Sequence, residues 1–258
     1  MINFFKNINY NLEKESNFKI IETNNIDILL KDLIKFEIQY TEKSILLENA
    51  QEISIDDCLI INHFTKISDI IISASKNWLA DNVTNNENWN TNLIINNEIL
   101  KKILEEINLK LGFDFISLEI DNTKFAKSIF KINEAIFIEK NNYLKIFNFL
   151  SLINYKKLII VKDIEYIEIE EIIKFSNLNF LILTNDFTKY IKKYNQLNFV
   201  AFYRNKIFVD IQTNVPIINY FENLKNREIS EEEDFFNNHD EENQFKYAFF
   251  NIKNSFFE

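Results

Sequence analysis

The sequence predicts an α/β protein whose head is a mainly parallel sheet with helical cover. The first observation is that short apolar runs alternate regularly with amphipathic helical segments in the second half of the chain. This alternation is typical of parallel strands joined by crossover helices. The second observation is a long helical stretch, residues 66–121, that interrupts the strand pattern. We therefore expect an α/β body that is split by an inserted helical leg.

The first half of the chain begins with strand patterns and a capped helix. Residues 2–10 and 17–22 have the apolar pattern of strands, and Asn25 caps a helical period that runs from Ile26 to Tyr40. Gly112 is a stop signal for the last helix of this half. The remaining elements expected here are strands at 44–48 and 57–62 and helices at 66–81 and 93–111, with a polar link over 82–92.

The second half alternates until Pro216, which breaks the pattern. The acidic stretch Glu228–Glu242 is expected to be solvated, and Phe245–Phe257 to form a docked terminal helix or an interaction segment. The periodicity predicts helices at 122–132, 142–155, 164–175 and 187–194 and strands at 135–138, 158–162, 179–184, 198–203 and 206–211. The expected organisation is a first head segment at 1–65, a leg at 66–121, a second head segment at 122–211 and a C-terminal extension at 212–258.

Gly112 is also the only glycine of the chain. Phosphate-binding loops need glycine where the backbone turns at positive φ or approaches an anion closely, so no Walker, dinucleotide-binding or nucleophile-elbow motif can be written. The turn where such a loop would lie, Glu22 to Asn25, has no lysine and is flanked by the carboxylates of Glu22 and Asp27. We expect no ATP or GTP binding and no enzymatic activity.

Cysteine and apolar content favour a cytoplasmic protein. Cys58 is the only cysteine, so no intrachain disulfide can form, which fits a reducing compartment. No apolar run reaches the roughly 20 residues that a membrane span needs, and the segment Met1–Lys6 does not have the pattern of a signal peptide. The two histidines, His63 and His239, have no partner at metal-ligand spacing, so neither a histidine metal site nor a catalytic triad is supported.

The net charge of −10 is distributed unevenly along the chain. Residues 1–121 have a net charge of −9 and residues 228–258 have −7, but residues 122–206 contain 14 bases and 8 acids, a net charge of +6. A positive segment of this kind can face phosphates. Because the chain has only two arginines, we expect any DNA binding to involve the backbone rather than the bases.

A lysine stripe is the most specific candidate for DNA contact. Lys124, Lys127 and Lys131 follow one face of a predicted helix whose opposite face is apolar. An ordinary solvated helix face explains the stripe about equally well. Further candidate contacts in the positive segment are Lys156, Lys157, Lys189, Lys192 and Lys193.

Acidic pairs are the only metal candidates. Glu119 and Asp121 alternate on the same face of an extended segment, with Asp114 a few residues upstream. Oxygen-only clusters of this kind suit Ca²⁺. Solvent-exposed acids in an acidic half of the chain are the simpler explanation, and a metal-dependent nuclease that uses these three residues is a further alternative.

The chain resembles the accessory spacer-acquisition protein of type II-A CRISPR systems, the Csn-two family. The resemblance covers about residues 15–211 by the order and pattern of its elements. It rests on Phe18–Glu22 leading through a glycine-free turn into a helix, on Leu118–Asp121 before a helix, and on the runs Leu144–Leu150, Lys156–Val161 and Leu178–Leu183. The extension 212–258 has no counterpart in that pattern.

The resemblance implies a head related to P-loop kinases that has lost nucleotide binding, with a helical leg inserted. It also implies a homotetrameric ring that encircles double-stranded DNA ends through a lysine-lined hole, with Ca²⁺ held by acids that match Glu119 and Asp121. The implied partners are an integrase pair and an effector nuclease in antiviral spacer acquisition. The alternatives are the metal-dependent nuclease and a protein-interaction module of a defence system that acts through its acidic, aromatic C-terminal tail.

Overall fold

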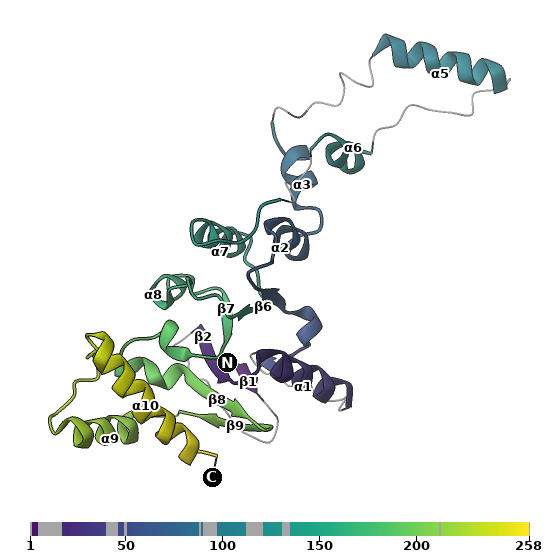
Figure 1. The fold of residues 1–258 in the computed structure, drawn as a ribbon. Coiled ribbons are helices and arrows are strands. Elements are labelled where there is room, and N and C mark those ends of the chain that lie inside the picture. Colours follow the sequence, from purple (N-terminus) through teal and green to yellow (C-terminus); the bar gives the residue numbers. More distant parts are fainter. Residues whose placement is uncertain are drawn as a thin grey trace. The chain divides into compact units, whose positions relative to one another are not determined.

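The protein is described by a computed structural model, which places residues 2–4, 17–39, 46–48, 51–87, 89, 97–111, 121–130, 135–211 and 213–257 (Figure 1). It divides into two compact units. The insertion unit comprises Lys66–Ile136, and the sheet unit comprises Met1–Thr65 together with Phe137–Glu258. The insertion unit therefore begins at Lys66, where the sequence predicts the start of the leg.

The sheet unit contains a six-stranded sheet in the order β5-β6-β7-β2-β8-β9. All neighbouring strands are parallel except β8 and β9, which are antiparallel. This confirms the predicted α/β class with a mainly parallel sheet. The strands are β2 (Phe18–Thr23), β5 (Leu59–Ile61), β6 (Leu158–Lys162), β7 (Asn179–Thr184), β8 (Val200–Arg204) and β9 (Ile207–Asp210).

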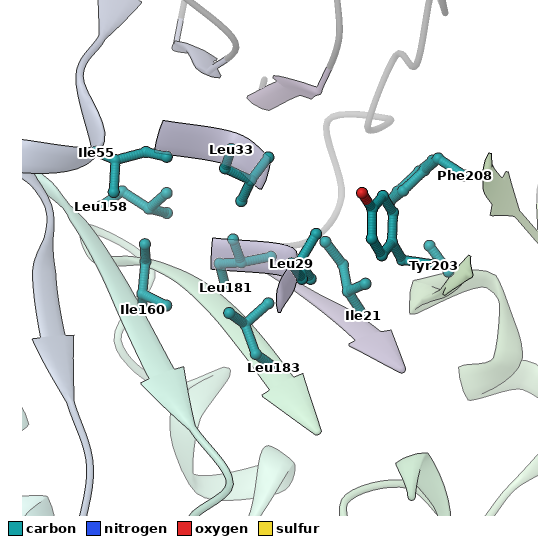
Figure 2. Packing of buried hydrophobic residues seen from close by; sticks show 11 residues of the cluster. Ile21, Leu29, Leu33, Ile55, Leu158, Ile160, Leu181, Leu183, Tyr203 and Phe208 are labelled. Atoms are coloured by element: carbon teal, nitrogen blue, oxygen red, sulfur yellow. The ribbon is translucent and has the colours of Figure 1, made fainter. Parts of the chain in front are cut away.

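The central strand β2 is buried along its whole length. It pairs Phe18 with Phe180 on one side and Ile20 with Val200 on the other. The face that includes Ile21 packs against α1 (Ile26–Gln39), and Figure 2 shows the resulting aliphatic cluster with Leu29 and Leu33 of that helix. The position of α1 directly after β2 follows from Asn25, whose Oδ1 accepts the Ile28 N–H at 3.0 Å and so caps the helix.

The remaining elements of the sheet unit are short strands and helices. The hairpin between β8 and β9 turns at Asn205 and Lys206, with φ of 53° and 65°, the two positive values of a type I′ turn. A separate antiparallel sheet has the order β1-β3-β4, formed by β1 (Ile2–Phe4), β3 (Leu46–Glu48) and β4 (Gln51–Ile53). The other helices are η1 (Ile55–Asp57), α7 (Tyr143–Leu152), α8 (Ile169–Ile172), η2 (Phe187–Lys189), η3 (Tyr194–Phe199), α9 (Val215–Lys225) and α10 (His239–Ser255).

The insertion unit is helical, and it extends beyond the predicted leg boundary at residue 121. The sequence pattern assigns residues 122–136 to the head, but they belong to this unit, in which α6 contacts α3. Ala80 of α3 and Ala126 of α6 are both fully buried. The Trp89 ring adds a contact with Phe125 at 5.7 Å between centroids. The helices are α2 (Ile67–Ala74), α3 (Trp78–Thr84), α5 (Glu98–Leu111) and α6 (Asn122–Ile129).

Several predicted elements differ in the structure. The expected helix 66–81 is two helices, with a break at Ser75 to Asn77. The expected strand 135–138 is reduced to a single bridge, in which the Ile67 N–H donates to the Ile136 carbonyl and the Ile138 N–H to the Thr65 carbonyl. The expected helices 164–175 and 187–194 shorten to α8 and to the 3-10 helix η2. A second 3-10 helix, η3, occupies Tyr194–Phe199, so the expected strand 198–203 begins only at Val200.

The C-terminal extension belongs to the sheet unit and is not an appendage. Pro216 does not break the structure; it lies in the first turn of α9, where its missing N–H is not needed. The acidic stretch is only partly solvated, because Ile229 and Phe235 are buried. Helix α10 begins at His239, earlier than predicted, and docks through Phe245 and Phe249.

A candidate site at the carboxyl ends of the parallel strands

The carboxyl ends of the parallel strands meet at one edge of the sheet, which is where open α/β sheets bind ligands. Charged side chains gather at this edge. Asp27, in the first turn of α1, pairs with Lys162 at the end of β6, and Lys189 after β7 pairs with Glu165 at 2.5 Å. Helix α10 adds Lys246, which lies 3.5 Å from Asp186.

The central element of this edge is an ion pair between the N-terminal and C-terminal regions of the chain. Glu22, at the end of β2, is only 6% exposed, and its Oε1 accepts a hydrogen bond from Lys253 of α10. The other oxygen, Oε2, accepts the Phe187 N–H at 3.1 Å. Burial raises the pKa of Glu22, while Lys253 and the Phe187 N–H act in the opposite direction. The carboxylate thus depends on Lys253 for its charge balance.

The backbone N–H groups of the turn between β2 and α1 are bound by side chains of the turn itself. The Thr23 hydroxyl accepts the Asn25 N–H at 3.3 Å, and Asn25 caps the helix as described above. The Asp27 carboxylate lies in the first helical turn. A phosphate at this position would have to displace the cap and approach two carboxylates, those of Glu22 and Asp27.

We therefore expect no saturable binding of Mg-ATP or Mg-GTP. A phosphate at this turn would compete with Glu22 and Asp27 for the lysines that already pair with them, Lys253 and Lys162. Once a lysine is drawn away, its carboxylate repels the phosphate by an amount on the order of 1 kcal/mol or more per charge even in a solvated setting. Isothermal titration calorimetry on the full chain measures this directly. A micromolar Kd would contradict the prediction and reopen the possibility of a nucleotide enzyme.

A cleft of about 400 Å³ lies beside the ion pair, between the ends of β2 and β8 and helix α10. Arg204, at the end of β8, donates from Nη1 to Asn254 Oδ1 of α10 at 3.0 Å. The Lys253 ammonium lies 5.9 Å from the centroid of the Phe202 ring. The cleft is lined by Glu22, Thr23, Asn24, Phe202, Tyr203, Arg204, Asn205, Phe250, Lys253, Asn254 and Phe257.

The predicted lysine stripe lies in the insertion unit. Lys124 and Lys127 are on α6, and the side chain of Lys124 is 86% exposed. Lys127 donates to Asn77 Oδ1 at 2.8 Å. Lys131 lies outside the described residues. The expected apolar face of this helix, Phe125, Ile129 and Ile132, is only partly confirmed: Phe125 is half-buried, Ile129 is 53% exposed, and Ile132 lies outside the described residues.

The other predicted lysines lie at opposite edges of the sheet. Lys156 and Lys157 precede β6 and so lie at the amino edge, where Lys157 is 3.4 Å from Asp57. Lys189 follows β7 at the carboxyl edge, where it pairs with Glu165, whereas Lys192 and Lys193 lie further along the crossover that leads from β7 back to the start of β8. Lys193 lies 3.5 Å from Glu232, while Lys156 and Lys192 are exposed. The structure therefore does not bring these five lysines together into one row.

Of the predicted metal ligands, only Asp121 is described; Asp114 and Glu119 lie outside the described residues. Asp121 caps α6, with Oδ1 accepting the Lys124 N–H at 3.0 Å, and this hydrogen bond lowers the pKa of the carboxyl group. The Asp121 carboxylate is therefore already engaged as the N-cap of α6. Within the described ranges, no group of three or more His, Cys, Asp and Glu side chains could hold a metal ion.

The roles of Lys253 and Arg204 in this site were not found from the sequence. Glu22 and Lys253 are 231 positions apart, so no local pattern could connect them. A signal did exist, because Lys246 and Lys253 are the only bases in the acidic segment 228–258, and both pair with acids at the carboxyl edge.

Comparison of the chain with models of known protein families gives no match, and comparison with curated proteins gives no significant match either. Of the helices that the structure describes, none has the length and apolarity to cross a membrane.

Proposed function

We propose that the chain is a non-enzymatic protein that binds the ends of double-stranded DNA as a homo-oligomer. On this proposal its head is a P-loop-kinase-like fold that has lost nucleotide binding. It acts in the acquisition of new CRISPR spacers, together with an integrase pair and an effector nuclease. The resemblance stated above motivates this function.

One observation carries the proposal. The end of β2, where a nucleotide-binding fold of this class holds phosphates, contains the buried Glu22 paired with Lys253 instead. This arrangement supports a scaffold rather than a nucleotide enzyme. Exposed lysines support contact with the DNA backbone: Lys156 at the amino edge of the sheet, and Lys124 on α6, whose side chain is 86% exposed although its ammonium lies 3.3 Å from Asp121.

The direct test is a competition assay by fluorescence anisotropy. A labelled linear duplex bound to the protein is displaced with unlabelled linear or relaxed circular duplex of the same sequence. We expect the linear form to compete better, and we expect affinity to fall with salt at a log–log slope of about −0.9 per neutralised phosphate. Equal competition by circles would contradict binding over an end.

The oligomeric state is measured separately. Light scattering gives the molar mass of the protein with and without linear DNA, and we expect the mass of a tetramer.

The lysine stripe gives a matched pair of variants. Changing Lys124, Lys127 and Lys131 to Glu should reduce DNA affinity without unfolding the protein, because exposed lysines contribute little to stability. The control carries the same charge change on another helix of the insertion unit, Lys101, Lys102 and Lys110 to Glu on α5, all exposed. An equal loss of affinity in both variants would show that total charge, and not this stripe, determines binding.

Ca²⁺ is proposed to bind through Glu119 and Asp121, with Asp114 as a further ligand. Binding to the native state alone should raise stability by about 2.7 kcal/mol at a hundredfold excess over Kd. Thermal melts measure this shift. The test variant is Glu119→Gln with Asp121→Asn, because asparagine still caps α6 and so preserves the helix. A shift that persists in this variant would exclude the site.

A second experiment tests for nuclease activity. We expect DNA to stay intact after incubation with the protein and Mg²⁺ or Mn²⁺, and degradation of the DNA would favour a nuclease.

A further inference from the structure

The cleft at the carboxyl edge has the volume of a small-ligand site. Its 400 Å³ lies within the range of about 300 to 1,000 Å³ that is typical of such sites. One wall is α10, which runs along β8 through contacts of Phe249 and Phe256 with Phe202 (Figure 1). The opposite wall is the β8–β9 turn and the end of β2.

The charge of the cleft is set by Arg204. The cleft contains three charged side chains, and two of them, Glu22 and Lys253, neutralise each other. Within the described part of the chain, no carboxylate pairs with Arg204, which bonds only to the neutral Asn254. Among the described residues, the cleft thus has one positive charge without an acidic partner, on a planar group that suits a phosphate.

An aromatic ring lies beside this charge. Phe250 is 55% exposed although it lines the cleft. It precedes Asn254 by four residues on α10, so the two side chains lie on the same helix face, one turn apart. Asn254 in turn holds the guanidinium of Arg204. The fold therefore places an open ring face and a cation within one helical turn of each other.

The two arginines of this chain differ in their hydrogen-bond partners. Arg227 is bound by Glu233, to which its Nη1 donates at 2.9 Å, as part of the packing of the acidic segment. Arg204 has no such carboxylate partner among the described residues. Arg204 thus lies in a cleft beside a ring and three asparagines, Asn24, Asn205 and Asn254, which together offer a cation, a stacking surface and hydrogen-bonding groups to a ligand.

We propose that this cleft binds one unpaired nucleotide at the end of a DNA strand. The base stacks on Phe250, its phosphodiester contacts Arg204, and the asparagine carboxamides, which both donate and accept hydrogen bonds, face the base edge. The single positive charge matches a phosphodiester and not a triphosphate, in keeping with the expected lack of ATP binding. The inference rests on the proposed DNA-end function and specifies its contact with the strand terminus.

The test compares a blunt duplex with a duplex of the same length that ends in a short oligothymidine overhang. In the wild-type protein the overhang should increase affinity about tenfold, the effect of stacking one base. Phe250→Ala and Arg204→Gln should each remove this gain and leave blunt-end affinity unchanged. The control is Tyr247→Ala, which removes a 73% exposed ring of the same helix that does not line the cleft.

The outcomes separate this inference from the proposed function. Blunt and overhang duplexes that bind equally, or a gain that persists in both cleft variants, would overturn the cleft assignment while DNA binding stands. If no duplex binds, the proposed function fails, and calorimetry with the dinucleotide pTpT still decides the cleft. Saturable pTpT binding that Phe250→Ala abolishes would support it. Absence of pTpT binding, or tighter binding of a phosphotyrosine peptide, would overturn it.

Discussion

Replacing Asp210 by alanine is expected to lower the free energy of unfolding by about 3 to 5 kcal/mol, the cost of leaving a buried charge without its partner. Asp210 on β9 forms an ion pair with Lys19 of β2, and the two side chains are 8% and 3% exposed. The Lys19 ammonium otherwise donates only to the Asn198 carbonyl at 3.2 Å, among the contacts that the structure describes. Burial lowers the pKa of Lys19 and raises that of Asp210, so each charge persists mainly through the other.

The matched control replaces both partners with apolar residues of similar volume, Lys19→Met with Asp210→Leu. Because the desolvation cost of the pair then disappears as well, the double variant should be about as stable as the wild-type protein, or more stable. Urea denaturation followed by circular dichroism measures both variants. A loss below about 1 kcal/mol in Asp210→Ala would indicate a solvated pair and contradict the burial of both side chains.

Phe245→Ala is expected to have a similarly large effect, about 3 to 5 kcal/mol, because it opens a cavity in a packed aromatic cluster. The Phe245 ring is 3% exposed and stacks on Phe235 at 4.5 Å and on Phe221 at 4.9 Å between centroids. These contacts join α10 to α9 and to the acidic segment. The variant therefore tests whether the C-terminal extension belongs to the folded core.

The same denaturation experiment includes Tyr247→Ala as its control. This exposed residue on the same helix should change stability by no more than about 0.5 kcal/mol. Hydrogen exchange then shows where the loss occurs. If Phe245→Ala opens α10 while protection of the central strands is unchanged, the extension is a separately docked element and the prediction of a global loss is wrong.

Elements with a strong local pattern were predicted well. The strands at 158–162 and 179–184 have the bounds that the sequence indicated, because each is a continuous apolar run closed by polar residues. Helix 26–39 was predicted from its cap and its period. The stretch 164–175 has apolar residues at helical spacing, but only 169–172 is helical. Its buried Ile164 and Ile167 pack into the core from an irregular backbone.

The site was only partially predictable. The sequence identified the turn after β2 and the carboxylates of Glu22 and Asp27, which are local features. Their cation partners Lys253 and Lys162 could not be assigned, because they come from distant segments that the sheet order brings together. The second boundary of the insertion unit was placed too early for the same reason, because the contact between α3 and α6 joins distant segments and has no local sequence pattern.

The position of β2 in the sheet has a consequence for how the protein is made. Phe18 pairs with Phe180, and Ile20 pairs with Val200, so both neighbours of this strand are synthesised long after it. Such distant pairing slows folding, because a long loop must close before the contacts form. Until then, a strand whose six residues are all buried in the native state has unpaired edges open to other chains. The nascent protein must therefore pass through a period of aggregation risk that ends only when β8 leaves the ribosome.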